Sequence, residues 1–262
     1  MKISLFRSAA ALCLAAGLLS ATGPSKAAAP AAAGRLDHDP VPRQHWSFDG
    51  PLGNFDLASV QRGYTVYAEI CSACHGMQHV HFGDLTGMGL TAAQVQAIAA
   101  SHKIPDGIGS DGKPALRAAT ADDAFPTPPV AQGLIPGAVI PPDQSRLAEV
   151  YPGGPDRIYA LLTGYGPPPA GVTPSPGLFY NRFAQGRAIA MPPPLSDDAV
   201  DYPDGTKATT EQEARDVTTF LAWAAQPHLA DRHRTGVRVM IYLVFLGVLL
   251  FVLKRRLWSN VH

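Results

Sequence analysis

The stretch from Cys71 to His75 reads Cys-Ser-Ala-Cys-His, a C-x-x-C-H pattern. Two thiols three positions apart lie on adjacent turns of a short helix, where both can form thioethers with the vinyl groups on one porphyrin edge. The imidazole of His75, directly after the second thiol, can then bind the iron. The pattern therefore predicts one covalently attached haem c, held by Cys71 and Cys74, with His75 as an axial iron ligand.

A C-x-x-C pair also occurs in thioredoxin-like redox sites and in zinc sites. This sequence has no second cysteine pair to complete a zinc site, and no strand-to-helix run leads into the motif. The third cysteine, Cys13, lies in an N-terminal segment that we expect to be removed. We therefore favour haem attachment over both alternatives and expect no structural disulfide.

The second iron ligand must approach the haem from the face opposite His75. This argues against the potential ligands that follow within six residues of that histidine, which are Met77, His79 and His81. The choice then lies between Met88 and Met191. Three prolines follow Met191 and restrict its backbone. Because an axial thioether bond to iron is weak and benefits from such restriction, we favour Met191.

The composition points to a single haem-centred domain. Of 262 residues only 16% are charged, while Gly and Pro number 25 each. We expect a mainly α fold, with short helices on long Pro/Gly-rich loops around the cofactor. Between Leu36 and Asp231 there are 21 acidic and 11 basic residues, a net charge of −10. This charge argues against nucleic acid as a partner and favours a basic protein, unless the acid excess only keeps the domain soluble.

The N-terminus has the features of a secretory signal peptide. Residues 1–27 contain two early cations, an apolar run from Ala9 to Leu19, and small residues up to Ala27. We expect cleavage near Ala27 or Ala28, with an uncleaved anchor as the alternative. Export fits the predicted cofactor, because c-type haem is attached outside the bacterial cytoplasm. The Ala-rich residues 28–45 are expected to form a flexible segment.

Apolar residues at helical spacing, together with start and stop signals, predict four helices in the haem domain, residues 46–234. The last should open at Thr210, which forms a capping-box pattern with Glu213. No regular structure is expected from Pro105 to Pro142, where Pro and Gly interrupt every periodic pattern. The expected helices are Ser59 to the haem motif, Thr91–Ala100, Pro155–Leu162 with Gly164 closing it, and Glu211–Ala225.

The C-terminus contains a candidate membrane anchor. Val239–Leu253 is an uncharged run, and residues 235–253 approach the 20 or so residues that a bilayer needs. Three cations, Lys254 to Arg256, follow at once and predict a cytoplasmic tail over residues 254–262. The haem domain would then face the periplasm from a single-pass anchor in the bacterial inner membrane.

The chain resembles the cytochrome c1 family, the haem-bearing subunits of the ubiquinol:cytochrome c oxidoreductase (cytochrome bc1) complex. The resemblance runs from about Trp46 to Trp258 and is strongest in the C-terminal block from Asp204 to Pro227. The segments that carry it besides the haem motif are Gln61–Tyr67, Pro141–Ser145, Leu161–Pro168, Ala188–Pro193 and Asp204–Pro227.

The resemblance implies roles for individual residues. It implies thioethers at the two motif cysteines, axial ligation by His75 and Met191, and a haem pocket lined by Pro141, Pro142, Leu161 and Leu162. The family usually also has an Asn before its Pro-Pro-Asp segment and an Arg before the following Gly-Gly, and this sequence has neither. As a hypothesis, Arg157 supplies the contact to a haem propionate instead.

The resemblance also implies the function and the partners. The chain would pass single electrons from the Rieske iron-sulfur protein through its haem to a cytochrome c acceptor, beside cytochrome b and membrane lipid, in a dimeric complex. We find no residue placed for acid/base or nucleophilic work, so the chain alone is not expected to be an enzyme. The alternatives are an anchored monohaem cytochrome that serves another dehydrogenase or oxidase, and a haem sensor or peroxidase.

Overall fold

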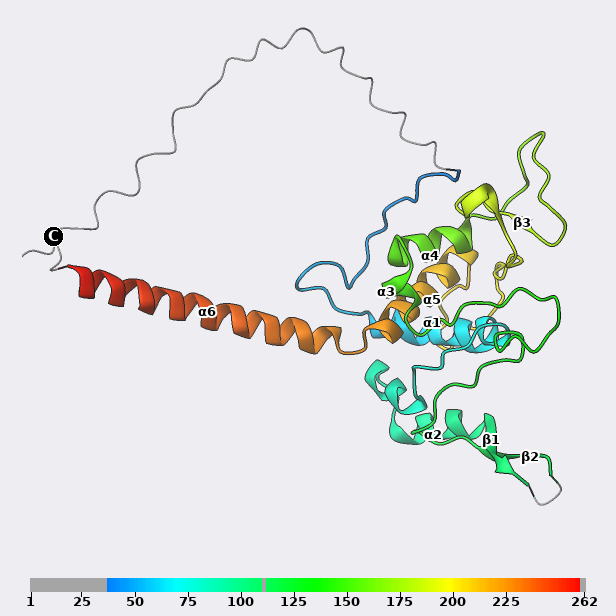
Figure 1. The fold of residues 1–262 in the computed structure, drawn as a ribbon, viewed down its shortest axis with the longest axis horizontal. Coiled ribbons are helices and arrows are strands. Elements are labelled where there is room, and N and C mark those ends of the chain that lie inside the picture. Colours follow the sequence, from blue (N-terminus) through cyan, green and yellow to red (C-terminus); the bar gives the residue numbers. More distant parts are fainter. Residues whose placement is uncertain (1–36, 110–111, 260–262) are drawn as a thin grey trace, which may run out of the picture. The chain divides into compact units, whose positions relative to one another are not determined.

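The computed structural model describes residues 37–109 and 112–259, so the expected signal peptide and Cys13 lie outside the described residues. The fold is mainly α, as the sequence predicts, with short antiparallel strand pairs (Figure 1). The helices are α1 (Leu57–Glu69), η1 (Cys71–Ala73), η2 (Phe82–Met88), α2 (Ala92–Ala100), α3 (Leu147–Val150), α4 (Gly154–Thr163), η3 (Gln185–Arg187), α5 (Thr210–Ala225) and α6 (Leu229–Trp258). The strands are β1 (Lys103–Ile108), β2 (Pro114–Ala118), β3 (Phe179–Tyr180) and β4 (Ala188–Ile189).

Helices α1 and α5 pack side by side and form the centre of the core (Figure 1). The side chain of Asp56 caps α1 by accepting a bond from the Ala58 amide at 3.1 Å. Gly63 lets the two backbones approach closely, since a Cβ atom there would lie 2.0 Å from the Asp216 carbonyl oxygen. The helix that leads into the haem motif is thus confirmed, and it is fixed against α5.

The start of α5 differs in detail from the expected capping box. Thr209 is the capping residue, and its hydroxyl accepts from the Gln212 amide at 3.2 Å. Thr210 instead donates to Asp197. Glu213 is fully buried, and its Oε1 accepts from the Ala199 amide at 3.0 Å. The predicted box was wrong because the loop before α5 provides tertiary partners for both of its members.

The region after Pro105 contains a strand pair that we did not expect. Strands β1 and β2 are antiparallel, with Lys103 opposite Ala118 and an irregularity between Pro105 and Ile108. Arg117 on β2 makes a two-point ion pair with Asp123, at 2.7 Å for each bond. Strand β1 is largely exposed, so its sequence lacks the alternation of apolar and polar residues by which half-buried strands are recognised.

Two further helices agree with the sequence. Helix α4 has a proline in its first turn and ends at Gly164, as predicted. Helix α6 contains the expected anchor, and its most apolar 18-residue window has a mean hydropathy of 2.5. None of that window is buried by the described residues. Among the described helices, α6 is therefore long and apolar enough to cross a membrane.

Candidate haem site

The haem motif follows directly after α1 as a tight turn. The amides of Cys74 and His75 both donate to the Cys71 carbonyl, at 3.1 and 2.8 Å, which fixes the three functional residues relative to one another. Cys74 is exposed, Cys71 is half-buried, and both are free thiols. Burial raises the pKa of the Cys71 thiol to about 12, and the nearby Cys74 thiol adds to the shift. Neither thiol is tied up in a disulfide, so both cysteines are available for thioether formation.

The His75 imidazole is buried and already oriented by the protein. Its Nδ1 atom lies 2.8 Å from the carbonyl oxygen of Pro142. Because a carbonyl can only accept, Nδ1 carries the proton and Nε2 keeps the lone pair that a metal ion needs. Burial lowers the pKa of His75, although the bond to Pro142 opposes the shift. The structure thus presents a neutral imidazole whose second nitrogen is suited to iron.

The segment around Pro142 is bound to the chain that follows His75. The Asp143 carboxylate accepts from the Gln78 amide at 2.9 Å, and the Gln144 amide donates to the Gly76 carbonyl at 2.8 Å. The Ser145 hydroxyl accepts from the His79 amide. Nothing in their local sequence indicates this role for the polar residues. They hold the Pro142 carbonyl in the position from which it orients His75.

Met191 lies on the loop that follows β4, and its backbone is anchored by Tyr165. The Tyr165 hydroxyl donates to the Met191 carbonyl oxygen at 2.9 Å. Met191 is half-buried. Its rival Met88 is only 1% exposed and belongs to the packed hydrophobic core, as does Met77. Met191 is therefore the methionine of these three that lies outside that core.

Helix α4 and the loop that carries Met191 share a buried asparagine. The Asn181 amide group donates to the Leu161 carbonyl at 2.7 Å and accepts from the Phe183 amide at 3.0 Å. The Leu161 side chain packs against Phe183, while Leu162 is half-buried. Asn181 is fully buried, and a single buried asparagine has no recognisable sequence signal. It joins the two elements on which four of the predicted site residues lie, Arg157, Leu161 and Leu162 on α4 and Met191 on the loop.

Arg157, on the same helix, is a buried cation with few acceptors. It is 9% exposed, and its Nη1 atom lies 3.3 Å from the His38 Nε2 atom. Within the described residues no carboxylate forms an ion pair with it. A buried guanidinium has five donors and normally pairs with an anion. The propionate of a bound haem would fit this requirement.

The site residues fall into two groups. Pro142 contacts His75 directly on one side, and Pro141 is its half-buried neighbour. Leu161 and Met191 belong to the second group, joined through Asn181 and Tyr165 by hydrogen bonds and by a backbone bridge between those two residues. A haem bound by His75 and Met191 would connect the groups, and the residues present fit such a group.

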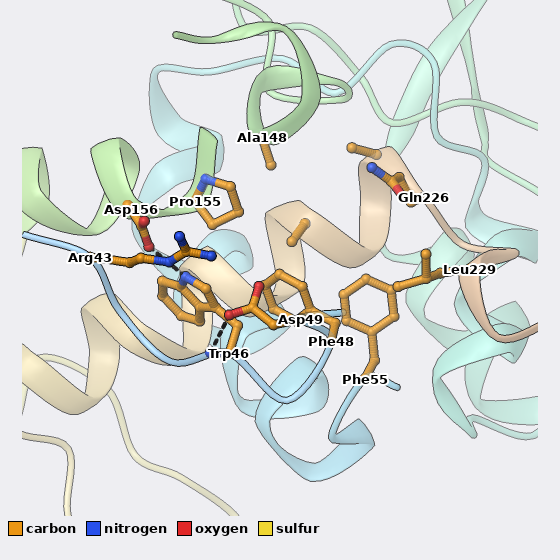
Figure 2. A pocket seen from close by; sticks show the side chains of 12 residues that line it. Arg43, Trp46, Phe48, Asp49, Phe55, Ala148, Pro155, Asp156, Gln226 and Leu229 are labelled. Carbon is orange, nitrogen blue, oxygen red and sulfur yellow. Dashed lines mark hydrogen bonds between the residues drawn. The ribbon is translucent and has the colours of Figure 1, made fainter. Parts of the chain in front are cut away.

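Two cavities among the described residues are lined by residues other than the predicted iron ligands. One of about 270 Å³ borders the motif at Ser72 and is lined by Tyr64 and Tyr67 of α1. Another of about 340 Å³ lies where α4 and α5 meet the segment around Trp46 (Figure 2). There the Trp46 indole donates to Asp156 at 2.8 Å. Neither lining includes a predicted haem ligand.

The comparisons with known proteins agree with one another, since all of them match proteins or a family named for cytochrome c1. A family model described as "Cytochrome C1 family" matches residues 46–261. The mitochondrial cytochrome c1 haem protein of Kluyveromyces lactis is 42% identical over 84% of this chain and 77% of that protein. The cytochrome c1 of Rhodospirillum rubrum is 37% identical over 84% and 88%. A Bradyrhizobium diazoefficiens protein named cytochrome b/c1 is 37% identical over 86% of this chain but only 36% of its own length.

Proposed function

Because this chain belongs to the cytochrome c1 family, we propose that it takes single electrons from a Rieske iron-sulfur protein and passes them to a cytochrome c acceptor. Like other members of the family it carries a covalently bound haem c and is an electron-transfer subunit of a cytochrome bc1 complex. The family match across residues 46–261 is the observation that carries the proposal.

We propose that Cys71 and Cys74 form the thioethers and that His75 and Met191 are the axial ligands. When bound, the haem supplies a one-electron Fe(III)/Fe(II) couple. The Pro142 carbonyl orients His75 so that Nε2 can bind iron. Tyr165 restrains the Met191 backbone. A thioether ligand stabilises Fe(II), so His/Met ligation would keep the potential high enough to accept electrons from a Rieske centre.

The remaining site residues would control the surroundings of the haem. Pro141, Pro142, Leu161 and Leu162 would exclude water from the porphyrin, which also favours the less charged Fe(II) state. Arg157 would pair with a propionate, a role supported by its burial without a carboxylate partner among the described residues. These residues bind and orient; none of them has to transfer a proton for the electron to move.

Helix α6 would anchor the chain in the membrane as a single pass beside cytochrome b. Its apolar surface is uncovered by the described residues and would be covered by lipid and by the partner subunit. The Bradyrhizobium relative's name, cytochrome b/c1, supports cytochrome b as that partner. The cations Lys254 to Arg256 would place the C-terminus in the cytoplasm and the haem domain in the periplasm, within a dimeric complex.

The proposal can be tested on the full chain, tagged and purified from membranes in mild detergent. We expect cytochrome b and the Rieske centre to co-purify with it, and ubiquinol to reduce its haem only when the Rieske protein is present. Purification without cytochrome b would favour an anchored cytochrome that serves another enzyme. Reduction by ubiquinol that is independent of the Rieske protein would contradict the proposed donor.

A further inference from the structure

His38 contacts the buried Arg157 through a ring nitrogen that must be unprotonated. Its Nδ1 atom lies 2.8 Å from the backbone carbonyl oxygen of Asp39, which can only accept, so Nδ1 carries the proton. The Nε2 atom then has the lone pair that accepts from Arg157 Nη1 at 3.3 Å. Only the neutral imidazole can make both bonds at once.

The segment that carries His38 is itself fixed to the loop before β4. The Asp39 amide donates to the Arg182 carbonyl at 2.9 Å, and its carboxylate pairs with Arg187 at 3.0 Å. The Gly186 amide donates to the Asp37 carboxylate at 2.9 Å. The same loop continues through β4 towards Met191. His38 therefore has a defined position relative to both α4 and the Met191 loop.

We propose that His38 is the positioning residue of Arg157 and holds the guanidinium in the orientation that meets a haem propionate. This rests on the proposed function, in which Arg157 is the propionate contact. Close packing against Gly153 fixes the stem of the Arg157 side chain, since a Cβ at Gly153 would lie 2.9 Å from Arg157 Cβ. The long stem still allows the head to rotate, and the bond to His38 removes that freedom.

Loss of the ring acceptor at His38 would release the guanidinium head of Arg157. The neighbouring Asp39 carboxylate is already engaged, since Arg182 and Arg187 lie 4.0 and 3.0 Å from it. Release of the head would weaken its contact with the propionate, so the haem potential should fall.

The test is a potentiometric titration of the haem in membranes at neutral pH. The variants are His38→Ala, His38→Gln and Arg157→Gln, with His45→Gln as the matched control. His45 is exposed on the same segment, and only its backbone carbonyl is hydrogen bonded within the described residues. The control should behave as the wild type.

Arg157→Gln should lower the potential, because a cation near the haem is lost. His38→Ala should lower it towards that of Arg157→Gln, because the guanidinium is released. His38→Gln keeps an amide oxygen that can accept from the guanidinium, so it should retain the wild-type potential. If His38→Ala fails to retain haem, His38→Leu, which has a larger side chain and no acceptor, takes its place.

The positioning role is overturned if the potential of His38→Ala, or of His38→Leu in its place, matches that of the wild type. The optical spectrum separates this result from failure of the proposed function. A low-spin His/Met spectrum in all variants would leave the proposed function intact while the role of His38 is rejected. A wild-type haem that lacks such a spectrum would reject the proposed ligation itself.

Discussion

Arg62 of α1 donates two hydrogen bonds to the buried carboxylate of Asp216 on α5, from Nε to Oδ2 at 2.8 Å and from Nη2 to Oδ1 at 3.1 Å. Asp216 is fully buried and also accepts from the Ser59 hydroxyl at 2.6 Å. The second Arg62 partner, Asp204, lies in the loop before α5. Arg62, Asp204 and Asp216 are thus joined in one network of hydrogen bonds and ion pairs. This network fixes α1, the helix that leads into the haem motif.

Replacing Asp216 by Ala should destabilise the protein strongly. The change leaves the largely buried Arg62 without its main partner, and breaking such a pair typically costs about 3–5 kcal/mol. The measurement is denaturant unfolding of the detergent-solubilised protein, followed by the haem absorbance. Arg146→Ala is the matched control, because its pair with Glu149 is exposed and should contribute little. Equal stability of the two variants would contradict the structural role of the network.

Gly63→Ala should prevent close packing of α1 on α5. The added Cβ would lie 2.0 Å from the Asp216 carbonyl oxygen and 2.7 Å from the Phe220 Cβ, so both helices would have to shift. We expect a loss of about 1–3 kcal/mol, seen as a lower yield of haem-loaded protein. Gly166→Ala is the control, since an added Cβ there meets nothing within 4 Å. A normal yield for Gly63→Ala would rule out this helix contact.

Acid stability should depend on Asp204. The Thr206 amide, together with Arg62, lowers the pKa of this carboxyl from an ordinary 3.8 to about 2. A folded-state pKa below the unfolded value contributes stability above about pH 4, and this contribution disappears as the pH falls towards 2. Asp204→Asn should therefore weaken the pH dependence of the unfolding midpoint in this window. An unchanged dependence would show that Asp204 does not contribute to acid unfolding.

The Met191 assignment predicts two distinct spectroscopic changes. Met191→His should lower the haem potential, because imidazole stabilises Fe(III) relative to a thioether. Met191→Ala should leave an open iron position, detectable as CO binding to the reduced protein. Met88→Leu is the control: this core residue should tolerate a substitution of similar volume with little change in potential. If only the Met88 variant alters the haem, the distal ligand has been assigned to the wrong methionine.

Electron transfer to a basic cytochrome c should slow as salt concentration rises. The net charge of −10 between Leu36 and Asp231 would attract such an acceptor, and added ions screen this attraction. The measurement is the rate of acceptor reduction by the intact complex over a series of ionic strengths. A neutral acceptor of similar potential serves as the control. Rates that do not change with salt would mean that the acid excess contributes only solubility.

Local sequence signals predicted a helix correctly where all of those signals lie within that helix or directly beside its ends. Proline in the first turn and Gly164 after the last set the limits of α4, and apolar spacing predicted α1 and α5. The same reasoning failed at the Thr210 capping box and at the β1–β2 pair. At the capping box, the loop before α5 supplies the partners of Thr210 and Glu213. At the strand pair, β1 is exposed and has no alternation of apolar and polar residues.

The sequence by itself predicted the haem c that the family carries, because the spacing of Cys71, Cys74 and His75 is the attachment signal. It also predicted a helix long and apolar enough to span a membrane, because such a helix is recognised from length and composition. Only the tertiary structure decided which His75 nitrogen is free, since the Pro142 carbonyl lies 67 residues further along the chain. The same holds for the pairing of Arg157 with His38, 119 residues apart. Such contacts depend on how separate elements pack, and one sequence contains no local record of that packing.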